Sequence, residues 1–154
     1  MLIVSTFPTP IGWFEVEYDE HFVYRAAFNH SGLEKPHQND FGAFIKNELD
    51  AYFQNPQYHF QLPLKPLGSC YQQRVWNSLL VIPAGRTMTY GELATQLQSS
   101  PRAIGQACRT NPVTLFIPCH RIVGKNNLGG YMGKEDALSY KLGLLQHENA
   151  RCID

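Results

Sequence analysis

Cys119, His120 and Arg121 follow one another directly after a hydrophobic run that ends at Pro118. A thiolate is a strong nucleophile, and an imidazole within reach can remove the proton of a thiol. A free cysteine, however, is more often a small buried hydrophobe than a nucleophile. The residues of this stretch leave both interpretations of Cys119 open, a core thiol or a nucleophile.

A histidine that acts as a base needs a partner that fixes its tautomer, usually a carboxylate or a carbonyl group. Acidic residues are few in the second half of the chain: Glu92 is expected in a helix cap, which leaves Glu135, Asp136 and Glu148 as candidates, and Glu148 stands at the end of an apolar helical stretch. The expected buried stripe of that helix is Leu138, Leu142 and Leu145. We therefore expect the helix to present Glu148 to His120.

Short helices are the elements that must position these side chains. Residues 70–82 have apolar side chains at helical spacing. Thr89 and Glu92 have the spacing of a capping box at the start of the next helix. Ser100 followed by Pro101 is typical of a further helix start, which predicts a helix to about residue 110. Two short helices joined by a tight turn suggest a helix-turn-helix.

The second helix of this pair has two expected faces. Ile104 and Cys108, four residues apart, should face the core. The other face carries small residues between two arginines: Arg102, Ala103, Gly105, Ala107 and Arg109. Small residues let a helix backbone approach a surface closely, and arginines contact phosphates. This face favours a nucleic-acid partner, although a helical glycine can also mark tight packing alone.

The first half of the chain predicts a small sheet and a helix. Residues 13–19 alternate apolar and acidic side chains, and residues 22–28 could be the hairpin partner of that strand. A helix should begin at Asp40 and end before Asn55, and residues 58–64 could add a strand.

The fold class expected is therefore α+β, with two domains. A stretch with proline and glycine at 62–69 favours a boundary between an N-terminal domain, 1–66, and a C-terminal domain, 67–154. The first should be an α/β domain with a short antiparallel sheet. The second should be mostly helical with a helix-turn-helix that resembles a winged helix.

The net charge of zero hides an uneven distribution along the chain. Residues 1–64 hold three basic and eight acidic residues, whereas residues 65–147 hold nine basic and three acidic ones. This split indicates an anionic partner for the second half, or a dipolar protein with solvated faces. The apolar runs are too short to cross a bilayer, and no export signal precedes them, which favours the cytoplasm.

The cysteines are Cys70, Cys108, Cys119 and Cys152, at wide and irregular spacings. This pattern fits a reduced compartment, and it does not contain the C-x-x-C pair of a structural zinc site. We interpret Cys70, Cys108 and Cys152 as structural thiols, and we expect no metal. Lys125 stands where a C-x5-R phosphatase loop requires arginine, and "GKNNLGG" departs from the phosphate-loop pattern.

The run "IPCHRIVG", preceded by "RAIGQACRTNPV", resembles the O6-alkylguanine-DNA alkyltransferase family, the methylated-DNA–protein-cysteine methyltransferases. The segments "VWNSLLVIPAGRTMTYGELA" upstream, and "LGGYMG" and "KLGLLQHE" downstream, match in the same order. The resemblance runs from about residue 70 to residue 148. The N-terminal half resembles the variable first domain of the family only loosely.

The resemblance implies a role for each residue at the cysteine. Cys119 would accept the alkyl group from O6-alkylguanine in DNA, with O4-alkylthymine as a second substrate of the same transfer. His120 would abstract the thiol proton through a water, and Glu148 would orient His120. Asn111 would bridge the helix-turn-helix to the site. Tyr90 would help to rotate the nucleotide and donate a proton toward the departing guanine.

The resemblance also implies how duplex DNA is bound. The second helix would enter the minor groove, with Arg102 in the place of the flipped-out guanine. Gly130, Tyr131 and Met132 would form the wall of the base pocket. The protein would act as a monomer, once per molecule and without a cofactor, in the cytoplasm or, in a bacterium, at the nucleoid.

Departures from the family pattern concern the pocket loop. The family commonly shows G-Y-x-G-G, whereas this chain has Lys134 in place of the second glycine and Met132 in the variable position. Both residues bear on how bulky an alkyl group can be. Two alternative functions are a non-catalytic relative that binds the lesion and recruits other repair factors, and an unrelated Cys-His hydrolase. For Arg121 we expect a structural ion pair or hydrogen bonds to carbonyl groups.

Overall fold

The computed structural model describes residues 1–150; Cys152 lies outside the described residues. The chain divides into two compact units. The first contains Met1–Leu67 and Pro112–Phe116, and the second contains Gly68–Asn111 and the described residues from Ile117 onward. The two units divide between Leu67 and Gly68, whereas the sequence predicts a boundary between residues 66 and 67, and five later residues also belong to the first unit. The assignment of separate functions to the two parts stays a prediction.

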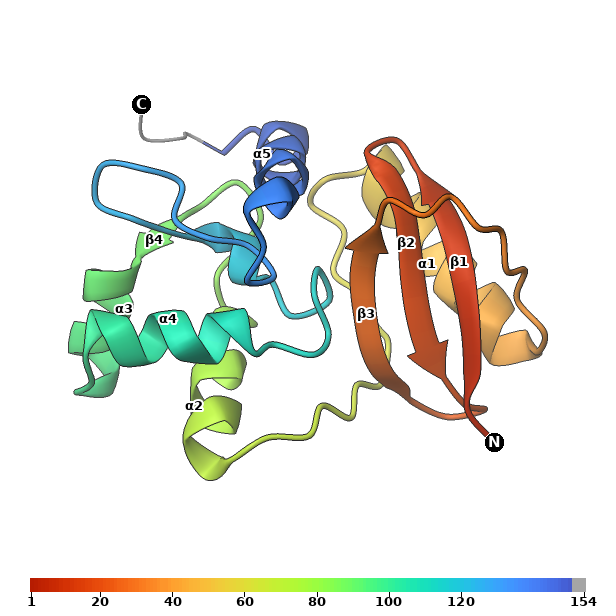
Figure 1. The fold of residues 1–154 in the computed structure, drawn as a ribbon, viewed down its shortest axis with the longest axis horizontal. Coiled ribbons are helices and arrows are strands. Elements are labelled where there is room, and N and C mark those ends of the chain that lie inside the picture. The colour runs from red at the N-terminus through yellow and green to blue at the C-terminus, as the bar shows by residue number, and fades with distance from the viewer. Residues whose placement is uncertain (151–154) are drawn as a thin grey trace. The chain divides into compact units, whose positions relative to one another are not determined.

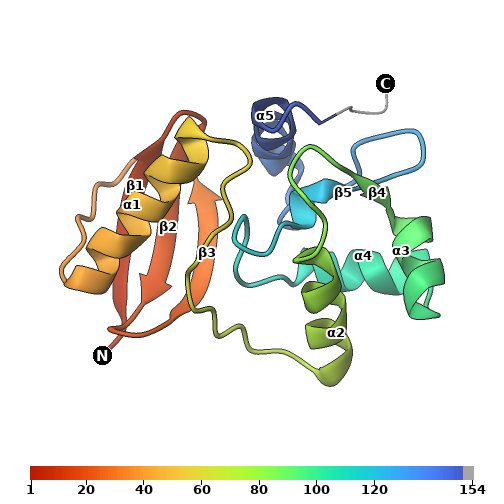
Figure 2. The same ribbon diagram turned by 180° about the vertical axis from the view of Figure 1, so that it is seen from behind.

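The first unit is a three-stranded antiparallel sheet with one helix. Strands β1 (Ile3–Thr9), β2 (Gly12–Tyr18) and β3 (Val23–Asn29) lie in the order β1-β2-β3. Phe14, Val16 and Tyr18 alternate along β2 and are fully buried, as the period-2 pattern predicts. Helix α1 (Asp40–Gln54) covers one face of the sheet (Figures 1 and 2). The predicted hairpin and helix are confirmed.

The additional strand predicted at 58–64 is wrong. Residues 58–63 have no ladder partner, and only Leu64 forms an isolated parallel bridge, with Val23. The physical reason is Pro63, which has no N–H to donate, so its carbonyl alone accepts from Val23 at 3.0 Å.

The segment Pro112–Phe116 packs with the first unit. Val113 forms a parallel bridge with Ala26, and Phe116 packs edge-on against Phe14 and Phe60, with ring centroids 5.4 and 4.8 Å apart. The hydrophobic run before Cys119 is therefore buried largely outside the unit that carries the cysteine. Asn111 and Ile117, the residues on either side of this segment, belong to the second unit.

The second unit is mostly helical. It contains helices α2 (Cys70–Leu79), α3 (Tyr90–Leu97), α4 (Pro101–Arg109) and α5 (Leu138–His147), with 3-10 turns at Cys119–Arg121 and Glu135–Ala137. Two-residue strands β4 (Met88–Thr89) and β5 (Ile122–Val123) pair in parallel. This ladder joins the start of α3 to the residues directly after Arg121. The α+β fold class is confirmed.

The helix pair α3–α4 begins and ends at the residues that the sequence indicates. Thr89 and Glu92 form the capping box of α3, and the side chain of Ser100 caps α4 by accepting from the N–H of Ala103. Gln98, with a φ of 55°, ends α3 in the left-handed region. The two helices pack on one another across this turn (Figure 1).

Helix α5 differs from the expectation in its buried face. Leu142, expected in the apolar stripe, is 37% exposed, whereas Lys141 is fully buried beside Leu144 and Leu145. The buried side of the helix is made by Tyr140, Lys141, Leu144, Leu145 and Glu148, so the buried face is rotated relative to the predicted one. Within residues 1–150, no helix is long and apolar enough to span a membrane.

Candidate active site

Cys119 lies at the start of a tight turn and is almost fully buried. The turn Cys119–Arg121 follows Pro118, and its Arg121 N–H donates to the Pro118 carbonyl at 3.0 Å. Successive side chains of a 3-10 turn point about 120° apart, so the three residues reach different surroundings. A strand would instead have sent Cys119 and His120 to opposite faces. The turn therefore permits both to serve one site.

The environment of Cys119 favours the protonated thiol over the thiolate. Burial raises its pKa, and this effect is opposed by a hydrogen bond with the Asn111 side chain and by the positive charge of Lys141. The Asn111 amide also donates to the carbonyl of Ile117 at 3.0 Å. Asn111, the second residue after α4, is thus tied to the backbone just before the cysteine. A nucleophilic role for Cys119 requires a base, since only the thiolate is reactive.

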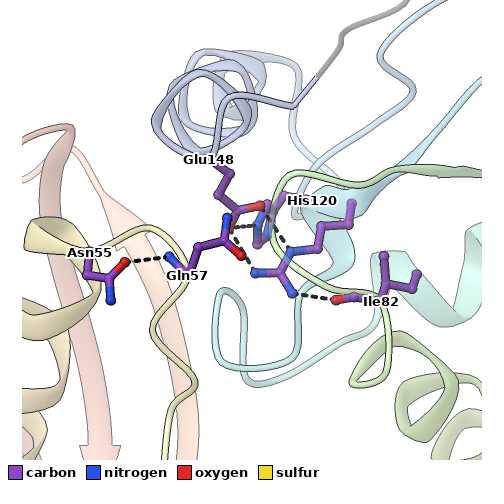
Figure 3. A network of polar contacts seen from close by, with 6 residues as sticks. Asn55, Gln57, Ile82, His120 and Glu148 are labelled. Atoms are coloured by element: carbon purple, nitrogen blue, oxygen red, sulfur yellow. Dashed lines mark hydrogen bonds and ion pairs between the residues drawn. The ribbon is translucent and has the colours of Figure 1, made fainter.

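His120 and Glu148 form a fully buried pair (Figure 3). His120 Nε2 lies 2.9 Å from Glu148 Oε2. Burial lowers the pKa of His120, although Glu148 acts in the opposite direction, so the imidazole is neutral at neutral pH. Because a carboxylate only accepts hydrogen bonds, Nε2 carries the proton and Nδ1 keeps its lone pair. Nδ1 has no hydrogen-bond partner among the described residues, which leaves it as the basic nitrogen.

Arg121 holds the other side of the same carboxylate. Its Nε and Nη2 donate to the two Glu148 oxygens at 3.0 and 2.9 Å, and its Nη1 donates to the Ile82 carbonyl at 2.6 Å (Figure 3). Burial opposes ionisation of Glu148, but the hydrogen bonds and charges of His120 and Arg121 hold the pKa of that carboxyl well below its usual range. The ion pair and carbonyl contact expected for Arg121 are confirmed.

Lys141 is a residue of the site that the sequence analysis missed. Its Nζ donates to the carbonyls of Ile122 at 2.6 Å and Gly130 at 2.9 Å, and it lies 5.9 Å from the centroid of the Tyr90 ring. Burial lowers its pKa to about 8. The signal in the sequence was its position three and four residues before Leu144 and Leu145, where a lysine interrupts an apolar helical stripe.

A cavity of about 390 Å³ opens onto Cys119. Residues far apart in the sequence line it, and seven of them are residues that the sequence analysis selected: Tyr90, Gly105, Arg109, Cys119, Gly130, Tyr131 and Met132. His120, Glu148 and Asn111 are buried and do not line it. The cavity can hold a flat ring system, since binding pockets for small ligands begin at roughly 300 Å³.

The loop that forms one wall of the cavity is fixed by Tyr90 and Lys141. The Gly130 N–H donates to the Tyr90 hydroxyl at 3.3 Å, and a Cβ at Gly129 would lie 2.5 Å from that hydroxyl. Lys134 N–H closes a turn onto the Tyr131 carbonyl at 3.2 Å, with positive φ at both Met132 and Gly133. Met132 thus occupies a backbone conformation that favours glycine.

Helix α4 presents most, but not all, of the predicted DNA-facing residues at its surface. Arg102 and Arg109 are exposed, and Ala103 and Gly105 are partly exposed. The prediction that Ala107 lies on the DNA-facing surface is wrong: its side chain is 1% exposed and lies on the inner side of the helix with Ile104 and Cys108. The reason is helical periodicity, since a residue three after Ile104 shares its face, and the Ala107 carbonyl accepts from Trp76 Nε1 at 2.8 Å.

Comparisons with known proteins show the family of the chain. Residues 70–150 match the family described as "6-O-methylguanine DNA methyltransferase, DNA binding domain". A methylated-DNA–protein-cysteine methyltransferase of Methanosarcina mazei is 40% identical over 108 residues, which are 68% of this chain and 68% of that protein. The chain belongs to this methyltransferase family. The expected enzyme class, a methylated-DNA–protein-cysteine methyltransferase, is thereby confirmed.

Relatives of the family also cover the first unit. A probable methylated-DNA–protein-cysteine methyltransferase of Acanthamoeba polyphaga mimivirus is 35% identical over 150 residues, 94% of this chain and 95% of that protein. The crystal structure of Mycobacterium tuberculosis O6-methylguanine methyltransferase has a TM-score of 0.82 and 30% identity, covering 97% of this chain and 93% of that one. The Mycobacterium tuberculosis OGT structure in complex with DNA has a TM-score of 0.79 and 30% identity, covering 97% and 94%. Residues 70–150 of this methyltransferase family member form a DNA-binding domain.

Proposed function

We propose that the protein repairs duplex DNA by transferring the alkyl group of O6-alkylguanine to the sulfur of Cys119, once per molecule. The observation that carries this proposal is the arrangement around the sulfur. Cys119 lies at the cavity with Tyr90 and Tyr131, and the neutral His120 held by Glu148 follows it in the same turn. The cavity can receive the base, and His120 can take the proton.

The reaction begins with proton removal. His120 Nδ1 accepts the Cys119 proton through a water, and the Glu148 carboxylate stabilises the imidazolium that forms. The thiolate then attacks the alkyl carbon; a C–S bond forms and the C–O6 bond breaks, with its electron pair moving to the guanine. Burial raises the pKa of Tyr90, so its phenol is protonated and can donate toward the departing base.

The product is a thioether, which ordinary cellular reductants do not cleave, so each molecule acts once. The same displacement extends to O4-alkylthymine, because its alkyl carbon also carries a heterocyclic leaving group. The roles of His120, Glu148, Asn111 and Tyr90 are part of this proposal. No cofactor is required, because the lesion supplies the alkyl group and the protein supplies the nucleophile.

The DNA is proposed to bind along helix α4 through its minor groove, with the damaged guanine flipped into the cavity. Arg102 enters the space of the flipped base, and Arg109 contacts the phosphate backbone. Gly105 supports the close approach: a Cβ there would meet only the Tyr90 ring, at 3.9 Å, so packing within the protein does not require glycine. We propose a monomer in the cytoplasm, associated with the nucleoid in a bacterium.

Mass spectrometry after incubation with duplex DNA that carries O6-methylguanine tests the transfer. The expected result is a gain of one methyl group, about 14 Da, on the peptide that contains Cys119. Cys119→Ser should abolish the gain and keep DNA affinity within a few-fold, because phosphate contacts dominate binding. Binding of the lesion without any mass change would instead support the non-catalytic relative, and repeated ester hydrolysis without DNA would support the hydrolase.

Arg102→Ala separates base flipping from chemistry. The variant should lose much more transfer from duplex DNA than from free O6-benzylguanine, which needs no flipping. An equal loss with both substrates would refute the role of Arg102 as the intercalating residue.

A further inference from the structure

Two free thiols, rather than one, line the cavity. Cys108 comes from the inner face of α4 and Cys119 from the turn after Pro118, and both are buried, with 8% and 5% exposure. Burial of Cys108 is what its helical position predicts, but its place on the cavity wall is decided by the fold. The two cysteines come from different elements and line the same cavity, and after the larger effect of burial the negative charge of a Cys119 thiolate raises the pKa of Cys108. The proposed function uses only Cys119.

We propose that Cys108 is a second alkyl acceptor, which captures the other carbon of a bifunctional lesion after Cys119 has accepted the first. The substrate class is an O6-alkylguanine with a leaving group on the second carbon, such as O6-(2-chloroethyl)guanine. The product is an ethylene bridge between the two sulfurs inside the cavity. This inference rests on the proposed function, because the first transfer must occur at Cys119.

The steps balance without an oxidant or a reductant. In the first, the C–O6 bond breaks, the Cys119 sulfur gains a 2-chloroethyl group, and guanine takes a proton. In the second, the thioether sulfur displaces chloride to form a three-membered episulfonium ring. The Cys108 sulfur then attacks a ring carbon, the ring opens, and the Cys108 proton passes to water. The net second reaction joins two sulfurs through ethylene and releases hydrogen chloride.

The cavity favours this outcome over capture by water or by DNA. When guanine leaves, the space of about 390 Å³ that received it becomes available to the chain on Cys119. A second thiol, that of Cys108, is held in the wall of that cavity by helix α4, and its effective concentration greatly exceeds that of a group in free solution. Burial raises the pKa of Cys108 to about 12, so the attack depends on the high reactivity of the episulfonium ring. The amine of Lys141, with a pKa lowered by burial to about 8, lies near both sulfurs and can assist loss of the proton.

Duplex DNA with freshly prepared O6-(2-chloroethyl)guanine tests the bridge in the full chain. Replacing two sulfhydryl hydrogens by one ethylene group should add about 26 Da to the protein, whereas simple hydrolysis on Cys119 should add about 44 Da. Trypsin cleaves after Arg102, Arg109 and Arg121, so the two cysteines fall in different peptides, 103–109 and 110–121. A bridged protein should give these two peptides as one linked species.

Two variants and a second lesion complete the test. Cys108→Ala should give only the hydrolysed adduct, while Cys70→Ser, which removes an exposed thiol, should give the bridge as the unmodified chain does. DNA with O6-ethylguanine, which has no second leaving group, is the reference lesion: the product with about 28 Da added measures the first transfer in each protein, and the amount of bridge is expressed relative to it.

The results separate this inference from the proposed function. The role of Cys108 would be overturned if the unsubstituted chain accepted the ethyl group of O6-ethylguanine but gave only the hydrolysed adduct with the chloroethyl lesion. A protein–DNA cross-link in place of the bridge would overturn it too. Bridge formation that persists in Cys108→Ala would overturn it as well. Failure of both lesions to modify the unsubstituted chain would instead contradict the proposed function.

Discussion

At the scale of single residues, different features of the site keep the Cys119 thiol protonated and remove its proton. Burial keeps Cys119 protonated, and the neutral His120 is kept ready by a carboxylate that cannot itself give up a proton. Glu148 remains ionised because His120 donates to it and Arg121 binds both of its oxygens. A buried carboxylate paired with only one partner would be less strongly held ionised, since burial disfavours the charged form. Arg121 therefore acts on the chemistry by fixing Glu148, and through it His120.

Lys141→Met is predicted to remove a pH dependence of stability. The pKa of Lys141 falls from an ordinary value of 10.5 to about 8 in the folded protein, so between these values the unfolded chain binds more protons. Folding stability contributed by this group therefore rises with pH across that interval, by about 3 kcal/mol. Denaturant unfolding at pH 8 and pH 10.5 should show this rise as the difference between the unsubstituted chain and the variant.

The comparison separates Lys141 from distant groups that titrate in the same range. Tyr24 and Tyr58 have raised pKa values, so their contribution to stability falls as pH rises, but it is the same in both proteins and cancels in the difference. The charge of Lys141 lowers the pKa of Cys108 and Cys119, and its loss in the variant changes the difference in the same direction as the titration of Lys141 itself.

Lys46→Met is the matched control, because Lys46 is exposed and its ammonium pairs with Asp50 at 2.9 Å on the surface. If Lys141→Met and Lys46→Met give the same profile, the buried ammonium has no such role.

At the scale of elements, helix α4 divides its residues between core and surface with a period of 3.6. Ile104, Ala107 and Cys108 face inward, while Arg102 and Arg109 are exposed. The β4–β5 ladder then holds the start of α3 beside the strand that follows the cysteine turn. The helix pair and the cysteine turn are thus joined by backbone hydrogen bonds. A DNA duplex bound along α4 would therefore lie at a fixed position relative to the cavity.

Gly105→Ala is predicted to change stability and DNA binding in opposite directions. Alanine in a helix interior is favoured over glycine by roughly 0.5–1 kcal/mol, and the new Cβ meets only the Tyr90 ring at 3.9 Å. The free protein should therefore be more stable in thermal or denaturant unfolding. Affinity for duplex DNA should fall by about tenfold, roughly 1.4 kcal/mol, because the methyl group prevents close approach of the groove. An unchanged affinity would contradict the assignment of this face to DNA.

Gly129→Ala gives the contrasting result and serves as the comparison. Gly129 has a φ of +73°, and its Cβ would lie 2.5 Å from the Tyr90 hydroxyl. Both the left-handed backbone and the collision should destabilise the free protein, by at least ~1 kcal/mol from the backbone alone. A stabilised Gly129→Ala would contradict the described contact of this loop with Tyr90.

At the scale of the whole molecule, charge is divided along the chain. Residues 65–147 hold nine basic residues, of which Arg121 and Lys141 are buried; Arg121 is paired within the protein and Lys141 binds backbone carbonyls. The others, including Arg102 and Arg109, are exposed and available to an anionic polymer. The eight acidic residues of 1–64 make that part unsuited to contact DNA. Binding should therefore depend on the basic half and weaken steeply with salt.

Salt titration of DNA binding checks this division. Arg109→Ala should flatten the slope of log affinity against log salt concentration by about 0.9, the value expected for one lost phosphate contact. Arg25→Ala, an equally exposed arginine of the acidic half, should leave the slope unchanged. Equal effects of the two substitutions would show that the phosphate contacts are not confined to the basic half.

Several elements follow from local patterns in the sequence. The caps of α3 and α4 depend on contacts three residues apart, and the β2–β3 hairpin depends on alternation, so both were predictable. The prediction of a strand at 58–64 was wrong because Pro63 has no N–H to donate, although the residues around it are apolar. The predicted places of Leu142 and Lys141 were exchanged because the Ile122 and Gly130 carbonyls accept from the buried Lys141 ammonium, and these tertiary contacts leave no signal in the helical pattern.

The sequence by itself determined which residues can carry the chemistry and the family to which the chain belongs, because the Pro-Cys-His-Arg run, the capped helix pair and Glu148 are local features of the chain. Only the tertiary structure decided that Arg121 and His120 share one carboxylate, that Lys141 is buried beside the cavity, and that Cys108 lines the same cavity as Cys119. The physical reason is distance along the chain: these contacts join residues separated by 11 to 28 positions or by whole elements. No periodicity of a helix or strand reaches that far, so packing alone brings them together.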